Sequence, residues 1–481
     1  MISIKSFLKE ATIYSLSNFL NKAITIFLLP LYTHYLTPGE FGMFDFILIT
    51  INLINLTIAF EIHQSIARFY SEWELEERKF YLSSALIFIL LVYSGFSIFV
   101  YLNKNLFAKI ILGDYNHYNI IIYSIGMIWT SGIYYFTQSQ LRWQMKSKEF
   151  AICTFTFTIT TFLASIILVK YNEMGLIGVI NGLTIGNIFG IITTLYFTRN
   201  SYGLFFSLRR VVSMLKFSSP LVFSSVSLFL LIYVDRIMIK NFLTFKDLGV
   251  FGIAYKFSSI LSFLSLGVNN AILPLIYNNH KDKTTPAQIS KILNLYILLS
   301  LMLMSIISIF SRELIMIFAT FEYLDATKII PFLILITILS SINNFIPGLF
   351  IEKKTKIIAY INIFTALFSL ITNYILIKKI GLIGSCYANL LAFSFGLSIN
   401  YFISQKYYPI DIFFVKILKI FIVSFILVTT NIFFIEYNIT FNIFFKFLLL
   451  FSYIPLCFLI FYSKNTIHNN FELSLKYIFR K

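Results

Sequence analysis

Apolar runs of about 20 residues alternate with short polar connections along most of the chain. A helix of that length crosses the hydrocarbon core of a bilayer, and fourteen such runs lie between residues 12 and 463. A membrane β-barrel would instead require shorter segments in which apolar and polar residues alternate, and the sequence has no such pattern. The pattern predicts an all-α polytopic membrane protein with about 14 transmembrane helices.

The composition supports this class and excludes an ordinary soluble enzyme. Of the 481 residues, 58% are hydrophobic and only 12% are charged, whereas about a quarter of the residues in a soluble domain are charged. The net charge of +17 does not indicate a nucleic-acid binder, because such proteins gather their basic residues on a polar face. We expect neither a metal site nor a disulfide, because the three cysteines lie singly in apolar runs with no C-x-x-C motif.

The distribution of Lys and Arg predicts the orientation in the membrane. With the N-terminus placed in the cytoplasm, 25 of the 38 cations fall in cytoplasmic loops and tails, and 9 fall in outer loops. Cytoplasmic loops of membrane proteins carry such an excess. We therefore expect both termini to be cytoplasmic.

The chain also repeats itself. Residues 36–44 (LTPGEFGMF) are similar to residues 243–251 (LTFKDLGVF) at an offset of 207, and residues 175–178 match residues 381–384 (both GLIG) at an offset of 206. This predicts two parallel six-helix lobes, 1–210 and 211–405, followed by two accessory helices and a cytoplasmic tail in 406–481. Parallel repeats are a transporter architecture, with substrate held near the membrane midplane.

Ionisable residues inside the spans are costly and mark candidate functional positions. Four cations fall within the predicted spans or at their ends: Lys22, Arg236, Lys256 and Lys446. Lys22 lies on one helical face with Asn18, about 16 Å from the start of its span, and a structural hydrogen-bonded lysine is the alternative. Lys256 lies about 10 Å below the outer surface, from where its side chain could also extend to that surface. We expect Lys446 at an interface.

Acidic residues are candidates for coupling sites, although structural roles compete. Asp45 and Asp235 could bind H⁺ or Na⁺, but Asp45 could equally be an outer-end residue. Asp235 and Arg236 are adjacent on one helix, so we expect them to face apart and find separate partners. We interpret Glu61 and His63, at the end of the second span, as interfacial residues.

Several motifs resemble those of Wzx-type polysaccharide (O-antigen) flippases of the multidrug/oligosaccharidyl-lipid/polysaccharide exporter superfamily. They are residues 29–33 (LPLYT), 36–42 (LTPGEFG), 67–70 (ARFY), 234–236 (VDR) and 249–256 (GVFGIAYK). The resemblance implies fourteen spans and translocation of undecaprenyl-diphosphate-linked oligosaccharide from the cytoplasmic to the periplasmic leaflet. It also implies alternating access coupled to an ion gradient, in the inner membrane of bacteria, as in lipopolysaccharide synthesis.

The resemblance also implies a basic cavity for the diphosphate, with Lys22, Lys256 and Arg68 at the matching positions. Lysine cannot make the bidentate phosphate contacts of arginine, which relatives often have there. The full set of expected substrate-binding residues is Lys22, Lys256, Arg68, Asn18 and Arg236. Asp45 and Asp235 are the expected ion-coupling residues, with H⁺ or Na⁺ as the ion.

The expected partners are membrane lipids, a polysaccharide polymerase and a chain-length regulator, without nucleic acid, cofactor or catalytic activity. Two alternatives remain. A multidrug or toxin exporter of the same superfamily, working as an antiporter, would normally have an acidic cavity, and the embedded lysines count against it. A polysaccharide polymerase of the same pathway would carry a large periplasmic loop and no two-lobe repeat.

The depth of Lys22 generates a prediction. Lys22→Ala should abolish surface polysaccharide, because a cation is removed from the cavity, while Lys22→Arg should largely preserve it. Surface polysaccharide is measured in cells whose variant protein is inserted in the membrane at the normal level. Normal polysaccharide with Lys22→Ala would rule out a cavity role for this residue.

Overall fold

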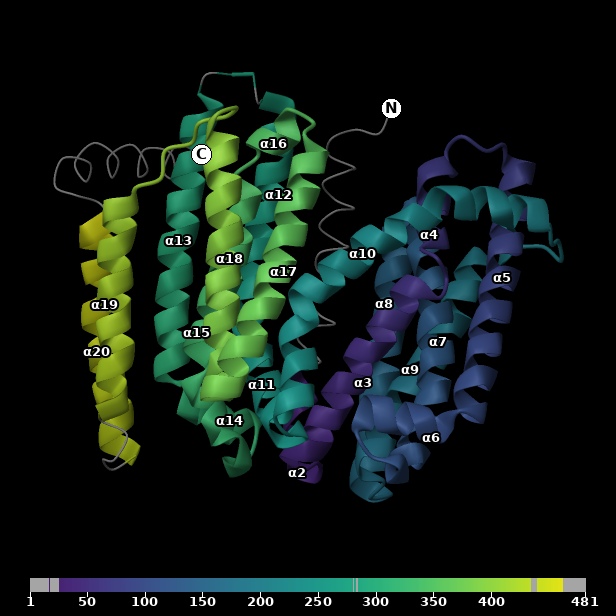
Figure 1. Ribbon diagram of the computed structural model, residues 1–481, viewed down its shortest axis with the longest axis horizontal. Coiled ribbons are helices and arrows are strands. Elements are labelled where there is room, and N and C mark those ends of the chain that lie inside the picture. Colours follow the sequence, from purple (N-terminus) through teal and green to yellow (C-terminus); the bar gives the residue numbers. More distant parts are fainter. Residues whose placement is uncertain (1–16, 18–25, 280, 283, 434–438, 462–481) are drawn as a thin grey trace. The chain divides into compact units, whose positions relative to one another are not determined.

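The computed structural model describes residues 17, 26–279, 281–282, 284–433 and 439–461, and these residues form helices joined by short connections (Figure 1). The described part of the chain contains no β-strand. The contacts divide the chain into two compact units. Unit 1 comprises Met1–Gly252 with Ile317–Tyr323, and unit 2 comprises Ile253–Met316 with Leu324–Lys481.

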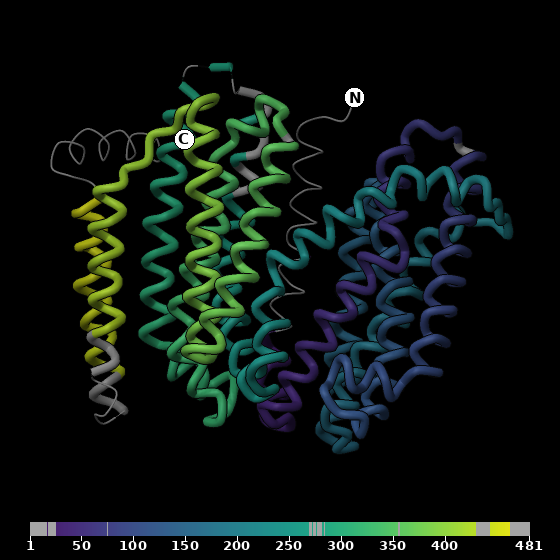
Figure 2. The backbone as a smooth tube through the Cα atoms, in the orientation of Figure 1, coloured from purple at the N-terminus to yellow at the C-terminus, as the bar shows by residue number. Residues whose placement is uncertain are grey.

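Unit 1 is a bundle whose long helices run from purple to teal in Figure 2. Its helices are α2 (Leu29–Tyr35), α3 (Pro38–Thr57), α4 (Ile62–Phe69), α5 (Leu75–Leu102), α6 (Lys104–Phe107), α7 (Tyr118–Trp143), α8 (Ser147–Ser165), α9 (Gly175–Thr198), α10 (Leu208–Phe242) and the first part of α11 (Phe245–Ser258). Small residues let α8 and α9 pack closely: a Cβ at Gly182 would lie 2.4 Å from Ser165 Oγ, and one at Gly186 would lie 1.9 Å from Thr161 Oγ1. Such small-residue contacts are the usual basis of helix packing in membranes.

Unit 2 contains the end of α11 and the helices that follow it. These are α12 (Leu261–Asn279), α13 (Thr285–Ile309), α14 (Ser311–Phe318, whose last two residues belong to unit 1), α15 (Ile330–Ile342), α16 (Gly348–Ile351), α17 (Thr355–Ile380), α18 (Leu382–Gln405), α19 (Phe414–Phe433) and α20 (Ile439–Phe461). Helix α13 is the most buried of the candidate spans. The hydroxyl of Tyr453 on α20 lies 3.0 Å from the Ser305 hydroxyl of α13 and 2.7 Å from the Ser424 hydroxyl of α19. These hydrogen bonds attach the accessory pair α19 and α20 to the bundle.

Lys446 is also part of this attachment. Its Nζ atom donates to both carboxylate oxygens of Glu313 on α14, at 2.7 and 2.9 Å, and the lysine is only 1% exposed. Lys446 therefore forms an ion pair inside unit 2, and the expectation that it lies at a membrane interface stays a prediction.

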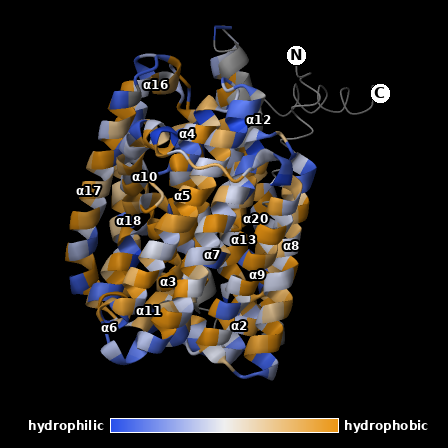
Figure 3. Ribbon diagram, turned by 90° about the vertical axis from the view of Figure 1, so that its right-hand side faces the viewer, coloured by the Kyte–Doolittle hydropathy of each residue, from blue (hydrophilic) through white to orange (hydrophobic). Residues whose placement is uncertain are grey.

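The prediction of an all-α membrane protein is confirmed. Among the described residues, eleven helices are long and apolar enough to cross a membrane, or twelve if the bent pair α11 and α12 is one span. Apolar residues dominate the middle of these helices and polar residues gather at their ends (Figure 3). Of the other two predicted spans, the first falls largely outside the described residues and the thirteenth corresponds to α19.

One predicted span differs in form. The sequence predicts a single helix over 249–273, but α11 ends at Ser258 and α12 begins at Leu261 with a bend of 43°. The Ser258 hydroxyl donates to the Ala254 carbonyl and the Ser259 hydroxyl to the Lys256 carbonyl. Such back-bonding competes with the helical ladder and bends helices.

The repeated motif forms two equivalent helix starts. Thr37 and Glu40 exchange backbone-to-side-chain hydrogen bonds at the start of α3, and Thr244 and Asp247 do the same at the start of α11. This reciprocal arrangement is a capping box, which satisfies otherwise unpaired backbone donors. The corresponding residues of the two boxes are 207 positions apart, as in the sequence repeat.

These two helices cross at a pair of glycines. A Cβ at Gly42 would lie 1.9 Å from the Phe245 carbonyl oxygen, and a Cβ at Gly249 would lie 2.0 Å from the Pro38 carbonyl oxygen. The contact is reciprocal, and both obstacles are backbone atoms, which cannot move aside without shifting a helix. Only glycine fits at either position.

This crossing generates a prediction. Gly42→Ala should destabilise the protein by about 1–3 kcal/mol, the usual cost of overpacking, because the new methyl group meets backbone. Thermal unfolding of the purified protein in detergent measures the effect. Gly39→Ala is the matched control on the same helix, since a Cβ there has open space, and equal melting temperatures for the two variants would contradict the crossing.

Candidate functional site

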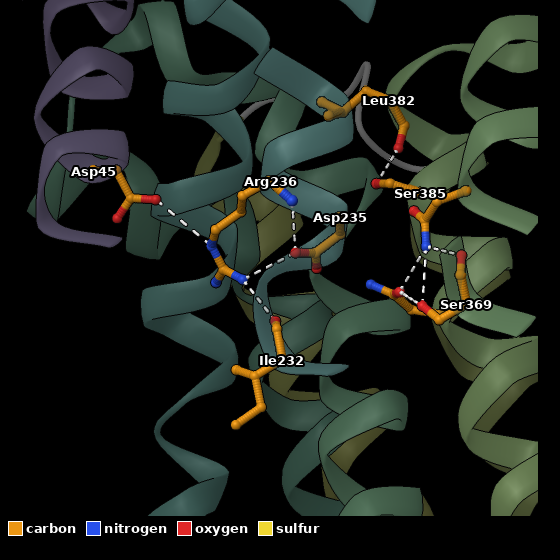
Figure 4. A network of polar contacts seen from close by, with 9 residues as sticks. Asp45, Ile232, Asp235, Arg236, Ser369, Leu382 and Ser385 are labelled. Atoms are coloured by element: carbon orange, nitrogen blue, oxygen red, sulfur yellow. Dashed lines mark hydrogen bonds and ion pairs between the residues drawn. The ribbon is translucent and has the colours of Figure 1, made fainter. Parts of the chain in front are cut away.

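Two carboxylates surround a buried arginine in unit 1 (Figure 4). Arg236 lies on α10, and its Nε atom is 3.6 Å from Oδ2 of Asp45 on α3. Its Nη1 atom is 3.2 Å from Oδ1 of the adjacent Asp235. Arg236 is 2% exposed and Asp235 is 5% exposed, so the structure brings three of the predicted site residues together in the interior of the bundle.

Further contacts hold the guanidinium in place. Nη1 of Arg236 also donates to the Ile232 carbonyl oxygen at 3.3 Å. The rings of Tyr233 and Phe251 lie 5.3 and 5.2 Å from its central carbon, within the range of cation–π attraction. A buried charge is tolerated only when it is paired and hydrogen-bonded, and Arg236 meets this requirement.

The expectation that Asp235 and Arg236 face apart with separate partners is wrong. Oδ1 of Asp235 accepts from both the backbone N–H and the side-chain Nη1 of Arg236. The rule that adjacent helix positions do not face each other considers only the starting direction of each side chain. The arginine side chain is long enough to fold back toward Asp235. Asp45 is likewise part of an ion pair and has a side chain that is 17% exposed.

Lys256 lies in unit 2, on the last turn of α11 and two residues before the bend. The residue is half-buried, and the Ser259 hydroxyl donates to its carbonyl oxygen at 2.7 Å. The structure therefore places this cation at a discontinuity of a membrane-spanning helix. Broken helices of this kind commonly carry substrate or ion sites in transporters.

The other expected substrate-binding residues differ in their placement. Arg68 lies near the end of α4, is more than half exposed, and pairs with Glu72 one turn later. Its guanidinium lies 5.2 Å from the ring of Phe69. Lys22 and Asn18 lie outside the described residues.

Glu61 and His63 form a polar cluster that the sequence interpretation missed. Both are buried inside unit 1, at 2% and 7% exposure. They follow the end of the α3 span, and the expectation that they lie at a membrane interface stays a prediction. Nε2 of His63 is 3.1 Å from Oε2 of Glu61 and 3.3 Å from the hydroxyl of Tyr135 on α7. The sequence does signal this cluster, because two ionisable residues directly follow a long apolar run. Their burial could not be predicted, because it depends on the turn between α3 and α4.

A second polar network joins α17 and α18 within unit 2. Asn373 Nδ2 donates to the Ser369 carbonyl at 2.8 Å and to Asn389 Oδ1 at 3.1 Å, and Ser369 Oγ donates to the same Asn389 oxygen. Figure 4 shows Ser369 together with the Ser385–Leu382 hydrogen bond on α18. The hydrogen bonds to Asn389 join the two helices through polar side chains. The described residues contain no cluster of three or more His, Cys, Asp or Glu that could hold a metal ion.

The fold and the comparisons together define a membrane transporter. A family model described as polysaccharide biosynthesis protein matches residues 7–280, more than half of the chain. The chain therefore belongs to the polysaccharide biosynthesis protein family, within the superfamily of multidrug, oligosaccharidyl-lipid and polysaccharide exporters. A second family model, MatE, matches residues 220–375.

Solved structures share the fold. One is the lipid II flippase MurJ in an inward closed conformation, with a TM-score of 0.75, 18% identity, and coverage of 93% of this chain and 98% of that chain. Another is a multidrug resistance MATE family transporter in an inward-facing conformation, with a TM-score of 0.61, 14% identity, and coverage of 82% and 94%. No curated protein matches the sequence.

The arginine cluster generates a prediction. Arg236→Gln should lower the melting temperature more than Asp45→Asn, because it leaves two carboxylates buried together, whereas Asp45→Asn leaves Arg236 paired with Asp235. The double variant should recover part of the loss, with a coupling energy of about 0.5–3 kcal/mol.

Thermal unfolding of purified protein measures all three variants. The control is Lys328→Gln, which removes an exposed ion pair with Asp325, and such pairs contribute little. Additive effects of Asp45→Asn and Arg236→Gln would contradict the cluster.

Proposed function

We propose that this protein translocates an undecaprenyl-diphosphate-linked oligosaccharide from the cytoplasmic to the periplasmic leaflet of the bacterial inner membrane. It moves the lipid by alternating access, with both termini in the cytoplasm and with an ion gradient as the energy source. Family membership and the fold shared with a lipid II flippase support this function. The observation that carries it is the presence of cations within membrane-spanning helices, above all Lys256 at the break of α11.

The substrate chemistry explains these cations. A diphosphate carries negative charge that must be stabilised while its lipid crosses the bilayer, and Lys and Arg are the side chains that bind phosphate. Lys22, Lys256 and Arg68, together with Asn18 and Arg236, bind this group in our proposal. The lysines act as point charges that tolerate different diphosphate orientations.

The arginine cluster supplies the coupling step of the proposal. Asp45 and Asp235 hold Arg236 in the described arrangement. A proton or Na⁺ that binds to either carboxylate competes with the guanidinium for it. Ion binding thereby weakens the pairing and releases Arg236 toward the diphosphate. This assigns ion coupling to the two aspartates and substrate binding to the arginine they control.

Further partners follow from the proposed translocation. The translocated unit is delivered on the periplasmic side, so the expected partners are a polysaccharide polymerase that uses this unit and a chain-length regulator. Membrane lipids surround the helices.

A multidrug exporter is the second candidate, favoured by the MatE match and the MATE-like fold. A site for cationic drugs needs an acidic group that the drug can reach. Asp45 and Asp235 both pair with Arg236, which disfavours this use of them. An O-antigen unit is accordingly the substrate that we propose.

The proposal predicts the effect of removing Lys256. Lys256→Ala should reduce surface polysaccharide at least about tenfold, because losing one charge-assisted hydrogen bond costs about 1.5–3 kcal/mol, while Lys256→Arg should retain most of it. Lipid-linked oligosaccharide should accumulate in the cytoplasmic leaflet of the Lys256→Ala strain.

The matched control is Lys328→Ala, because this lysine is exposed. Wild-type polysaccharide with Lys256→Ala at normal protein level would contradict the role of Lys256. Wild-type polysaccharide after deletion of the gene, together with new sensitivity to a cationic drug, would favour the exporter.

A further inference from the structure

We propose that residues 204–217, which lead into α10 and form its first turns, are a membrane-anchoring surface that binds anionic phospholipids. We call these residues the anchor segment. Its apolar side chains enter the hydrocarbon, and Arg209, Arg210 and Lys216 bind the lipid phosphates. The anchor segment lies entirely within unit 1. It does not rest on the proposed transport function, because it concerns the surrounding lipid and not the transported substrate.

Helix α10 is longer than a bilayer requires. Its 35 residues extend over about 52 Å, whereas the hydrocarbon core is about 30 Å thick. Pro220 lies inside the helix, and proline bends a helix because it removes a backbone hydrogen bond. Figure 1 shows that the first part of α10 crosses the end of unit 1 at which α4 ends and α5 begins, at a large angle to α5. This geometry suits a segment that lies along the membrane surface.

The first turns of α10 bury one side and expose another. Val211, Met214 and Ser218 are buried at spacings of three and four residues, which places them on one side of the helix. Helix α10 packs against α4 and α5. Leu208 and Val212, one turn apart on a different side, are both exposed. The helix therefore presents an apolar stripe that the protein itself does not cover.

The residues before the helix extend this apolar stripe. Leu204 is fully exposed, and Phe205 and Phe206 are each almost half exposed. Large apolar side chains that gather on a surface mark a site of contact with protein or membrane. Hydrocarbon removes the cost of exposing them to water.

Buried serines of α5 hold this exposed run in place. The backbone N–H of Gly203 donates to the Ser83 hydroxyl at 2.8 Å, and that of Ser207 donates to the Ser84 hydroxyl at 3.0 Å. Both serines are buried. The run is thus fixed on either side of its three apolar residues, and its side chains are already directed outward before they meet lipid.

The same stretch of chain is strongly basic. Residues 199–234 contain Arg199, Arg209, Arg210 and Lys216 and no Asp or Glu. None of the ion pairs among the described residues involves these four cations. Anionic lipid headgroups complement this charge, because each Lys or Arg close to an anionic membrane surface strengthens binding several-fold.

Aromatic rings hold Arg210 in position. Its central carbon lies 4.5 Å from the centre of the Phe80 ring and 5.4 Å from that of Tyr81. Trp73 stacks on Tyr81, with ring centres 4.0 Å apart and planes 2° apart. Cation–π attraction to the rings leaves the N–H groups of the guanidinium able to bind two phosphate oxygens at once. Tryptophan and tyrosine are also the residues that concentrate at membrane interfaces.

A lipid surface fits these observations better than a soluble protein partner. Cations without acidic partners lie directly beside an exposed apolar stripe, which is the pattern of helices that lie in the interface of an anionic membrane. The anchor segment also continues into the membrane-spanning part of the same helix, so it begins where the bilayer ends. We therefore assign phospholipid, and not protein, as the occupant.

The insertion is tested on the purified full-length protein in liposomes, with a nitrobenzoxadiazole label on Leu204→Cys. Leu204 is fully exposed, so the label should not disturb the fold, and Cys153, Cys386 and Cys457 are buried and should not react. Phosphatidylcholine with a nitroxide on its acyl chain should quench this label, because the side chain lies in hydrocarbon. The same label on the exposed Glu72→Cys is the matched control, which iodide in the water should quench instead.

The preference for anionic lipid is measured with the same label. Nitroxide-labelled phosphatidylglycerol and phosphatidylcholine are compared at equal mole fractions, and we expect the former to be preferred about fivefold. Arg209→Gln/Arg210→Gln should abolish the preference, and Lys148→Gln should retain it, because Lys148 is an exposed lysine outside the anchor segment. Salt at about 1 M should also abolish it by screening, which keeps the test valid if the double variant does not fold.

Three outcomes would overturn the proposal. Equal quenching by the two lipids at low salt would rule out the binding of anionic lipid. A preference that survives both high salt and the double variant would rule out the arginines as its cause. Quenching of the Leu204→Cys label by iodide and by neither lipid would place the anchor segment in water, where a soluble protein would bind. None of these outcomes depends on the transport function, because the liposomes contain no lipid-linked oligosaccharide.

Discussion

Hydrocarbon offers no hydrogen-bond partner, so every polar group in the membrane-spanning helices must be satisfied within the protein. The chain meets this constraint in different ways along its length. Arg236 is held by two carboxylates and Lys446 by Glu313, while Asn373 bonds across to Asn389. Many serine and threonine hydroxyls donate to carbonyls of the preceding turn instead. A buried charge that lacks part of its set of partners is an exception to this constraint. Such a charge indicates a functional position, because it is stable only in one protonation or binding state.

The sequence predicts the helices well because long apolar runs are local signals. Thr37 and Thr244 start their helices as the motif requires, and the apolar runs correspond to the described helices. The bend after Ser258 was not predictable, because hydropathy continues unbroken across it. The partners of the embedded charges could not be predicted from the sequence either, because they depend on which helix faces pack against each other. The contact of Arg236 with Asp235, and the burial of Glu61 by a left-handed turn, arise from side-chain and backbone geometry that no periodicity encodes.

The embedded charges connect structure to transport. The described cations of the membrane-spanning helices lie in different settings. Lys446 has a dedicated carboxylate and fixes the accessory helices. Lys256 lies at a helix break, where backbone geometry is least regular. Arg236 pairs with two carboxylates, which in our proposal also bind the ions that drive transport. Competition between a guanidinium and a small cation is a direct way to couple an ion gradient to an anionic substrate.

The central claim is that the protein moves a diphosphate-linked lipid across the bilayer. It is tested most directly by reconstituting the purified protein in liposomes that carry a fluorescent undecaprenyl-diphosphate oligosaccharide. The fraction of label in the outer leaflet is followed with a membrane-impermeant quencher. We expect transfer well above the rate of protein-free liposomes, accelerated by an imposed H⁺ or Na⁺ gradient. Transfer at the protein-free rate under either gradient, in liposomes where the same protein transports a cationic drug, would contradict it.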